Sequence, residues 1–213
     1  MIALLEDMFG QYELLTAKAD GFFRDVAGEY GDGVRCGVRC SDCCSSVFGL
    51  FLIESVYLSH HFSKLDRRRR REALSRSEKA DRQMLEVQKK LQECSADPET
   101  QARAMAKERV RCPLLGADGK CVLYAVRPLT CRVYGIPTLI NGETRCCWKA
   151  GFEKGRSYPV FDLDGAYREL YGLSRAILER FGHKDTEDRA SLLLSVSKSI
   201  KTPVEELIKP YTE

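Results

Sequence analysis

The sequence lacks the features that place a chain in a membrane or an export pathway. No stretch reaches the roughly 18 uninterrupted apolar residues that a spanning helix needs. The first residues, MIALLEDMFGQYELL, include Glu6 and Asp7 and contain neither a basic n-region nor a long apolar core, so we expect no signal peptide. The formal charge of +3 is too small to favour nucleic acid as a partner. We therefore expect a cytoplasmic protein that binds neither membrane nor nucleic acid.

Familiar catalytic motifs are also missing. The chain has no Gly-rich phosphate loop, no HExxH and no Ser-His-Asp order, and it has no internal repeat. Its composition, 44% hydrophobic and 31% charged over 213 residues, is typical of a globular protein with a real core. We expect a single domain over residues 1–213.

Cysteine occurs at ten positions, and its thiol can bind a metal ion or form a disulfide. Cys94 stands alone on an apolar helix seam, and we interpret it as a small buried residue. In a reducing compartment, cysteines clustered at short spacing are more typical of metal ligands than of disulfides. The other nine are therefore our predicted metal ligands: Cys36, Cys40, Cys43, Cys44, Cys112, Cys121, Cys131, Cys146 and Cys147.

The first cluster, CGVRCSDCC, allows two interpretations. Cys36, Cys40 and Cys43 form C-x3-C-x2-C, the spacing that in radical enzymes leaves one iron of a cubane cluster free for S-adenosylmethionine. Alternatively, Cys43 and Cys44 belong with ligands far down the chain. Neighbouring side chains point in different directions, so we expect these two cysteines to face different centres, and the same for the pair at 146–147. The chain shows no repeated strand–helix pattern, which argues against the radical-enzyme barrel.

Apolar periodicity predicts a mainly α-helical fold around an irregular cysteine-rich centre. We expect helices at 2–30, at about 54–62, at 63–94, at 99–110, at 165–181, at 187–200 and after Thr202, and short strands at 121–124 and 138–140. The residues at 63–110 should form a long helical hairpin, turning at 95–98, inserted between the two cysteine groups.

Local signals place the ends of several elements. Asp164 is the expected N-cap and Gly182 the expected end of one helix, and Asn141-Gly142 is the expected turn of a small β-hairpin. Thr202 should cap the last helix, with Pro203 at its first position. The arginine run 67–71 is interpreted as a solvated helix face.

The second cysteine group carries a resemblance to a known family. It contains Cys112-Pro113-Leu114, Gly119-Lys120-Cys121, Tyr124, Arg127-Pro128 and Cys131-Arg132. With CGVRCSDCC, these motifs resemble the CxxCxxCC family of zinc- or iron-chelating domains, which includes flagellin lysine N-methylases. The match covers about residues 34–52 and 110–150, and three residues rather than two separate Cys36 from Cys40. The resemblance implies a cysteine-bound metal and S-adenosylmethionine-dependent methyl transfer.

Three residues of the second group are candidates for chemistry. Arg127 and Arg132 are predicted to bind a cofactor and to act in catalysis, because guanidinium groups bind carboxylates and donate to cluster sulfurs. Tyr124 is the third catalytic candidate. The alternatives are a structural ion pair for each arginine and core packing for the tyrosine.

Three further side chains receive interpretations outside catalysis. His60 and His61 are more typical of a helix end than of a metal site. Trp148 either shields the metal from water or is an ordinary hydrophobic anchor.

Our leading hypothesis is an iron–sulfur enzyme, with a [4Fe-4S] cluster, that modifies a protein or small molecule. Its reaction would be that of a metal-cluster-dependent transferase or oxidoreductase. The alternative is a zinc-stabilised binding module without catalysis, for which nine clustered thiols also suffice. Simple electron carriage is a third possibility. The substrate and the oligomeric state stay open.

Overall fold

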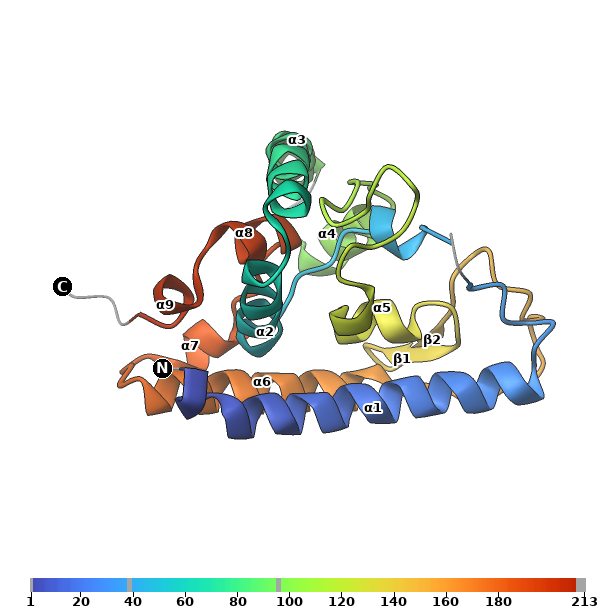
Figure 1. Ribbon diagram of the computed structural model, residues 1–213. Coiled ribbons are helices and arrows are strands. Elements are labelled where there is room, and N and C mark those ends of the chain that lie inside the picture. Colours follow the sequence, from blue (N-terminus) through green and yellow to red (C-terminus); the bar gives the residue numbers. More distant parts are fainter. Residues whose placement is uncertain (1, 38–39, 95–96, 210–213) are drawn as a thin grey trace.

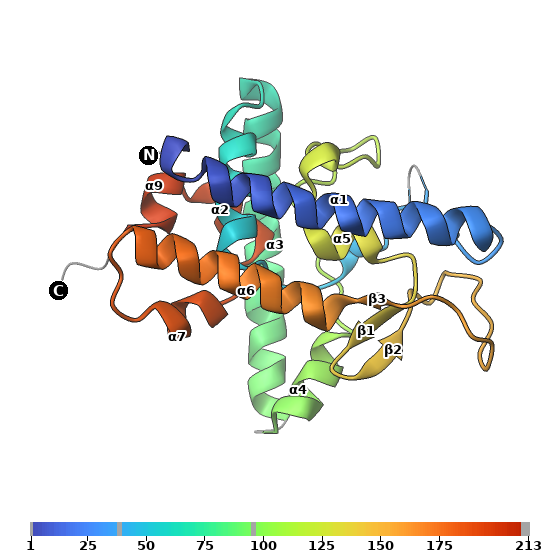
Figure 2. The same cartoon turned by 90° about the horizontal axis from the view of Figure 1, so that it is seen from below.

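The computed structural model describes residues 2–37, 40–94 and 97–209, and within them the fold is mainly helical, as predicted. Two long helices, α1 (Glu6–Glu29) and α6 (Leu163–Arg180), lie side by side in both views of the molecule (Figures 1 and 2). Helix α2 (Leu52–Ser63) packs on both of them.

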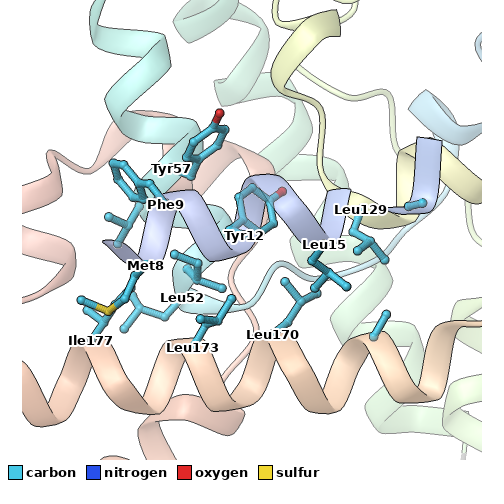
Figure 3. Close-up of a cluster of buried hydrophobic side chains, with 14 of the residues drawn as sticks. Met8, Phe9, Tyr12, Leu15, Leu52, Tyr57, Leu129, Leu170, Leu173 and Ile177 are labelled. Atoms are coloured by element: carbon cyan, nitrogen blue, oxygen red, sulfur yellow. The ribbon is translucent and has the colours of Figure 1, made fainter. Parts of the chain in front are cut away.

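The core forms where these three helices meet (Figure 3). Apolar side chains recur at three- and four-residue spacing along α1, so Met8, Tyr12 and Leu15 face Leu170 and Ile177 of α6. Leu52 and Tyr57 of α2 and Leu129 close this cluster from the other side. Each fully buried leucine of this kind contributes about 1.5–3 kcal/mol to the free energy of unfolding.

A short helix, α5 (Leu129–Val133), carries Cys131 and rests against α1. The structure does not bear out the strand predicted at 121–124: Cys121 makes an isolated bridge with Leu115, and a 3-10 turn, η3 (Tyr124–Val126), follows. The loop folds back on itself through Gly116 N and the carbonyl of Lys120, 2.8 Å apart, so the chain turns instead of extending.

The predicted hairpin is present. Strand β1 (Thr138–Ile140) pairs antiparallel with β2 (Glu143–Arg145), and Asn141 and Gly142 both adopt positive φ in the turn. Sequence reasoning missed a third strand, β3 (Phe161–Asp162), which pairs parallel with β1. The sheet leads directly into α6.

The predicted cap of α6 is wrong, because Asp162 caps this helix by accepting from Gly165 N at 2.8 Å. Asp164 instead accepts from the amides of Asn141 and Gly142 at 2.9 and 3.1 Å, which ties the helix to the hairpin. Gly182 follows the helix with a φ of 76°, as expected of a terminating glycine.

The helical arm begins later than predicted. Helix α2 continues to Ser63, and α3 (Arg67–Cys94) starts after Asp66, whose carboxylate accepts from Arg69 N at 3.0 Å. Helix α4 (Pro98–Met105) packs back against α3 and ends short of residue 110, because Val110 donates to the carbonyl of Ser45 at 3.0 Å. Residues 95 and 96 of the predicted turn, and the side chain of Cys94, lie outside the described part.

The arm is packed against the body of the protein. Its seam buries Ala73, Ser77, Ala80, Val87 and Leu91. It runs across α1 and α6 in Figure 2 and contacts α8 (Val196–Lys201).

The helix predicted at 187–200 is two helices, α7 (Thr186–Ser191) and α8, because Leu194 between them pairs with Leu50 as an isolated bridge. The last helix, α9 (Val204–Leu207), has Pro203 rather than Thr202 at its N-cap position. Within the described ranges, no helix combines the length and the apolar character needed to cross a membrane.

Candidate metal centre

Backbone pairing brings the two cysteine groups together. The first group ends in a 3-10 turn, η2 (Cys43–Ser45), and the carbonyl of Cys44 accepts from Cys112 N at 2.6 Å. Ser46 and Arg109 form an antiparallel bridge beside this contact. Cys44 and Cys112, which the arm separates in sequence, are therefore neighbours in space.

Helix α5 brings Cys131 to the same place. Glu54 accepts hydrogen bonds from Leu129 N at 3.0 Å and Phe51 N at 3.1 Å, so one buried carboxylate caps both α5 and α2. Arg132 forms an ion pair with Asp20 of α1 and donates to the carbonyls of Ala125 and Arg127, each at 2.9 Å. Contacts from α2 and from α1 thus fix the position of α5 and of its Cys131.

Five thiols form what we call the inner thiol group, defined as Cys43, Cys44, Cys112, Cys121 and Cys131. Hydrogen bonds from Cys131 and Cys44 stabilise the Cys43 thiolate and hold its pKa well below the usual thiol range. The same bonds raise the pKa values of Cys44 and Cys131. The thiols of Cys43 and Cys44 are hydrogen-bonded to each other, and both line the same two cavities described below. The expectation that they serve different metal centres stays a prediction.

Burial raises the pKa of Cys112 to about 12, and burial also raises the pKa of Cys121. Thiols in such surroundings stay protonated without a partner that stabilises the charged form. A soft metal is one such partner, since a coordinating thiol is deprotonated on binding.

The outer thiol group consists of Cys36, Cys40, Cys43 and Cys147, so Cys43 belongs to both groups. Burial raises the pKa of Cys36 to about 11, and the nearby thiols of Cys40, Cys43 and Cys147 act in the same direction. The neighbouring Cys146 is exposed. The expectation that Cys146 and Cys147 face different metal centres stays a prediction.

Asp42 joins the outer group to the segment that carries Cys147. This carboxylate is 7% exposed and accepts from Trp148 Nε1 at 3.2 Å, Cys147 Sγ at 3.5 Å and the Tyr134 hydroxyl at 3.3 Å. Lys149 pairs with it at 3.3 Å. Burial opposes ionisation, but hydrogen bonds from Lys149 and Cys147 outweigh it and lower the pKa of Asp42.

The largest space among the thiols is a cavity of about 360 Å³, which we call the large cavity. Its thiols come from both groups: Cys36, Cys40, Cys43, Cys44, Cys121 and Cys131. Lys120, Arg127 and Arg132 also line it, and no Asp or Glu appears among its described lining residues. The wall thus combines soft ligands with positive charge.

Two smaller cavities adjoin it. One, of about 70 Å³, lies between the inner thiol group and the arm residues Ala80 and Met84, and we call it the arm cavity. The other, of about 10 Å³, is lined by the outer thiol group and is called the small cavity.

All nine cysteines whose side chains are described are free thiols. Among the described residues, no three or more His, Cys, Asp and Glu side chains are placed so as to hold a metal ion directly. The thiols therefore gather around cavities without a preformed coordination sphere.

Among the candidate residues other than cysteine, some line the cavities and others do not. Arg127 lines the large and arm cavities and pairs with Asp20 at 3.2 Å, with its guanidinium 4.3 Å from the ring centroid of Tyr124. Tyr124 is 59% exposed at the large cavity, so the packing alternative does not describe it.

His60 and His61 lie at the end of α2, where they stack on Phe9 and Tyr57, and neither lines any of the three cavities. Trp148 is 72% exposed and therefore covers no thiol as a buried shield would. The same exposure argues against a hydrophobic anchor, and the indole Nε1 instead donates to Asp42 at 3.2 Å.

Sequence reasoning missed Asp20, Asp42 and Gly135. Asp42 was detectable, since a carboxylate inside a cysteine cluster is a natural hydrogen-bond acceptor there. Asp20 carries no local signal, because its partner Arg132 lies 112 residues away. Gly135 carries none either: it leaves room for Cys36, from a separate loop, because a Cβ at position 135 would overlap the Cβ of Cys36.

Comparison of the chain with protein-family models, curated proteins and solved structures finds no match. The resemblance to the CxxCxxCC family accordingly stays a prediction.

Proposed function

We propose that the protein is an iron–sulfur enzyme in which the inner thiol group binds the cluster at the wall of the large cavity. The observation that carries this proposal is the large cavity itself, about 360 Å³ in volume and bordered by six cysteines. Thiolates are soft ligands that select zinc, copper(I) and iron–sulfur clusters. The described thiols form no disulfides, and thiols clustered in this way are suited to bind a metal centre of this kind.

The size of the cavity favours a cluster over a single ion at this position. A structural zinc ion lies about 2.3 Å from each of four sulfurs, and so compact an arrangement leaves no room for a space of this volume. Four members of the inner group, Cys43, Cys44, Cys121 and Cys131, line both the large cavity and the arm cavity. Thiols on a shared wall of this kind suit a polynuclear centre.

The charged residues of the large cavity support an anionic occupant. Lys120, Arg127 and Arg132 provide three cationic groups, and Asp20 pairs with both arginines. The positive charge that is left over offsets thiolates and attracts a carboxylate. Tyr124, exposed at this cavity and stacked on Arg127, is placed to contact a bound molecule.

A cluster held by three of the five inner thiols would supply one-electron chemistry and would leave one iron free for the amino and carboxylate groups of S-adenosylmethionine. Arg127 would then orient the carboxylate, and Arg132 would position α5 and its cysteine. The proposed reaction class is modification of a protein or small molecule, with methyl transfer suggested by the family resemblance.

The proposal is tested on protein purified without oxygen. We expect a brown protein whose electron paramagnetic resonance signal, after reduction, changes on addition of S-adenosylmethionine. Cys131→Ser should lose most of the colour, whereas Cys146→Ser, which removes an exposed thiol outside the three cavities, should keep it. Colourless wild-type protein would refute the cluster, and an unchanged resonance signal would refute S-adenosylmethionine as its ligand.

A further inference from the structure

The cationic residues of the large cavity differ in whether their charge is already paired. Arg127 and Arg132 both pair with Asp20, and each also donates to backbone carbonyls. Lys120 is exposed, and its amine has no ion-pair or hydrogen-bond partner among the described residues. Of the described residues that line this cavity, Lys120 is therefore the cation whose charge is left for a ligand.

A tight turn of the backbone holds Lys120 at the cavity. The amide of Gly116 donates to the carbonyl of Lys120 at 2.8 Å, and Gly119 adopts a φ of 76° within the turn. The carboxylate of Asp118 accepts from the amide of Lys120 at 3.1 Å. Because this nearby carboxylate binds the backbone of the turn, it does not neutralise the lysine amine.

Tyr124 supplies an aromatic surface at the same cavity. The residue is 59% exposed, and the guanidinium of Arg127 lies 4.3 Å from its ring centroid. Phe23 also lines the cavity. Rings of this kind pack on other flat rings in offset or edge-to-face arrangements. The volume of about 360 Å³ is typical of a site for a small molecule. The cavity therefore suits a small molecule that contains a flat ring.

The charges of the cavity select the sign of that molecule. Asp20 offsets one of the three positive charges, and a [4Fe-4S] cluster held by three thiolates would offset about one more. The charge that remains attracts a carboxylate or a phosphate. A protonated amine, such as the acceptor of a lysine methylase, would lose its water without gaining a carboxylate partner among the described lining residues. The cavity therefore favours an anion over a cation.

We propose that the large cavity binds a small molecule in which a carboxylate or phosphate lies next to a flat ring, with Lys120 on the anionic group and Tyr124 against the ring. Molecules of this class are the substrates of the proposed enzyme, so their part in catalysis rests on the proposed function. Lys120 and Tyr124 belong to one short segment that also carries Cys121. The bound molecule therefore lies beside the inner thiol group.

The test measures the binding of three matched probes to the whole protein by isothermal titration calorimetry: phenyl phosphate, benzoate and benzylamine. At least one of the two anions should bind about tenfold more tightly than benzylamine, and the tighter anion identifies the group that is bound. Lys120→Gln should weaken its binding about fivefold. The matched control is Lys154→Gln, which removes an exposed lysine outside the three cavities and should keep wild-type affinity. Benzylamine binding as tight as that of the anions, or wild-type affinity in Lys120→Gln, would overturn the anion site.

A second pair of variants tests the aromatic contact. Tyr124→Phe keeps the ring and should keep the affinity, whereas Tyr124→Ala should weaken it about fivefold, with circular dichroism showing that the helices persist. Wild-type affinity in Tyr124→Ala would overturn the contact with the ring. Iron and acid-labile sulfide are measured in the same samples. Anion binding by protein without iron and sulfide would refute the cluster and leave this site standing. Iron and sulfide in protein that does not prefer the anions would refute this site and leave the cluster standing.

Discussion

The carboxylate of Glu54, in helix α2, accepts a hydrogen bond from the amide of Leu129, the first residue of α5, at 3.0 Å. Glu54 is 3% exposed and also accepts from Phe51 N. Because Cys131 lies two residues after Leu129, this contact connects the thiol region to the helical core. It also places an ionisable group where burial disfavours its charged form.

Glu54 predicts a pH dependence of stability. Burial raises its pKa from 4.5 to about 7, so the folded state binds a proton that the unfolded state releases. The free energy of unfolding should fall as pH rises from about 4.5 to about 7, by at most about 3 kcal/mol from this group. Urea unfolding across this range should show the slope in wild-type protein and its loss in Glu54→Gln. Glu169→Gln, at an exposed site on α6, should keep the slope; the same slope in both variants would contradict the assignment.

Neutralising Asp20 should lower the stability of the fold. Asp20→Asn removes the ion-pair partner of Arg132, which is 7% exposed, and of Arg127. A buried cation left without its partner should lower the free energy of unfolding by about 2 kcal/mol or more. Asp25→Asn, at an exposed position of the same helix, should change it by less than about 0.5 kcal/mol. Equal unfolding midpoints for the two variants would contradict this account.

The arm offers a matched pair of substitutions on one helix. Val87 is 4% exposed in the seam of α3, whereas Leu85 is 55% exposed. Val87→Asp should lower the free energy of unfolding by about 3 kcal/mol, because it buries an unpaired charge. Leu85→Asp should leave it nearly unchanged. Similar thermal unfolding midpoints for both variants would show that the arm does not pack as described.

Trp148 is the single tryptophan of the chain and reports on Asp42, which accepts from its Nε1 at 3.2 Å. The pKa of Asp42 is lowered, so the carboxylate should stay ionised until the pH falls below 3.8, and its protonation should not change the fluorescence emission above that pH. Asp42→Asn should change the emission at pH 7, whereas Asp32→Asn, at an exposed position, should not. Identical emission from wild-type protein and Asp42→Asn would contradict the contact.

The sequence predicts the elements whose signals are local. Helix α1 follows from its apolar spacing, and the hairpin at 138–145 follows from Asn141-Gly142, since few other residues adopt positive φ. The predicted helix boundaries are wrong where a tertiary or capping contact sets the end of the helix. Asp66 rather than Ser63 marks the start of α3, and pairing of Leu194 with Leu50 divides the region predicted as one helix at 187–200.

The thiol region, likewise, could be predicted from the sequence only in part. Clustering of the cysteines in sequence predicts that they gather, and both groups line shared cavities. Their partition depends on backbone pairing between Cys44 and Cys112 and on the missing side chain at Gly135, neither of which spacing reveals. The extra residue between Cys36 and Cys40 is compatible with a ligand role for Cys36, since the loop still brings both thiols to the small cavity.

The central claim is that the inner thiol group holds an iron–sulfur cluster. Iron and acid-labile sulfide, measured per chain in protein purified without oxygen, test it most directly. The account predicts about four of each, as in a [4Fe-4S] cluster. Protein with zinc alone and no sulfide would contradict it.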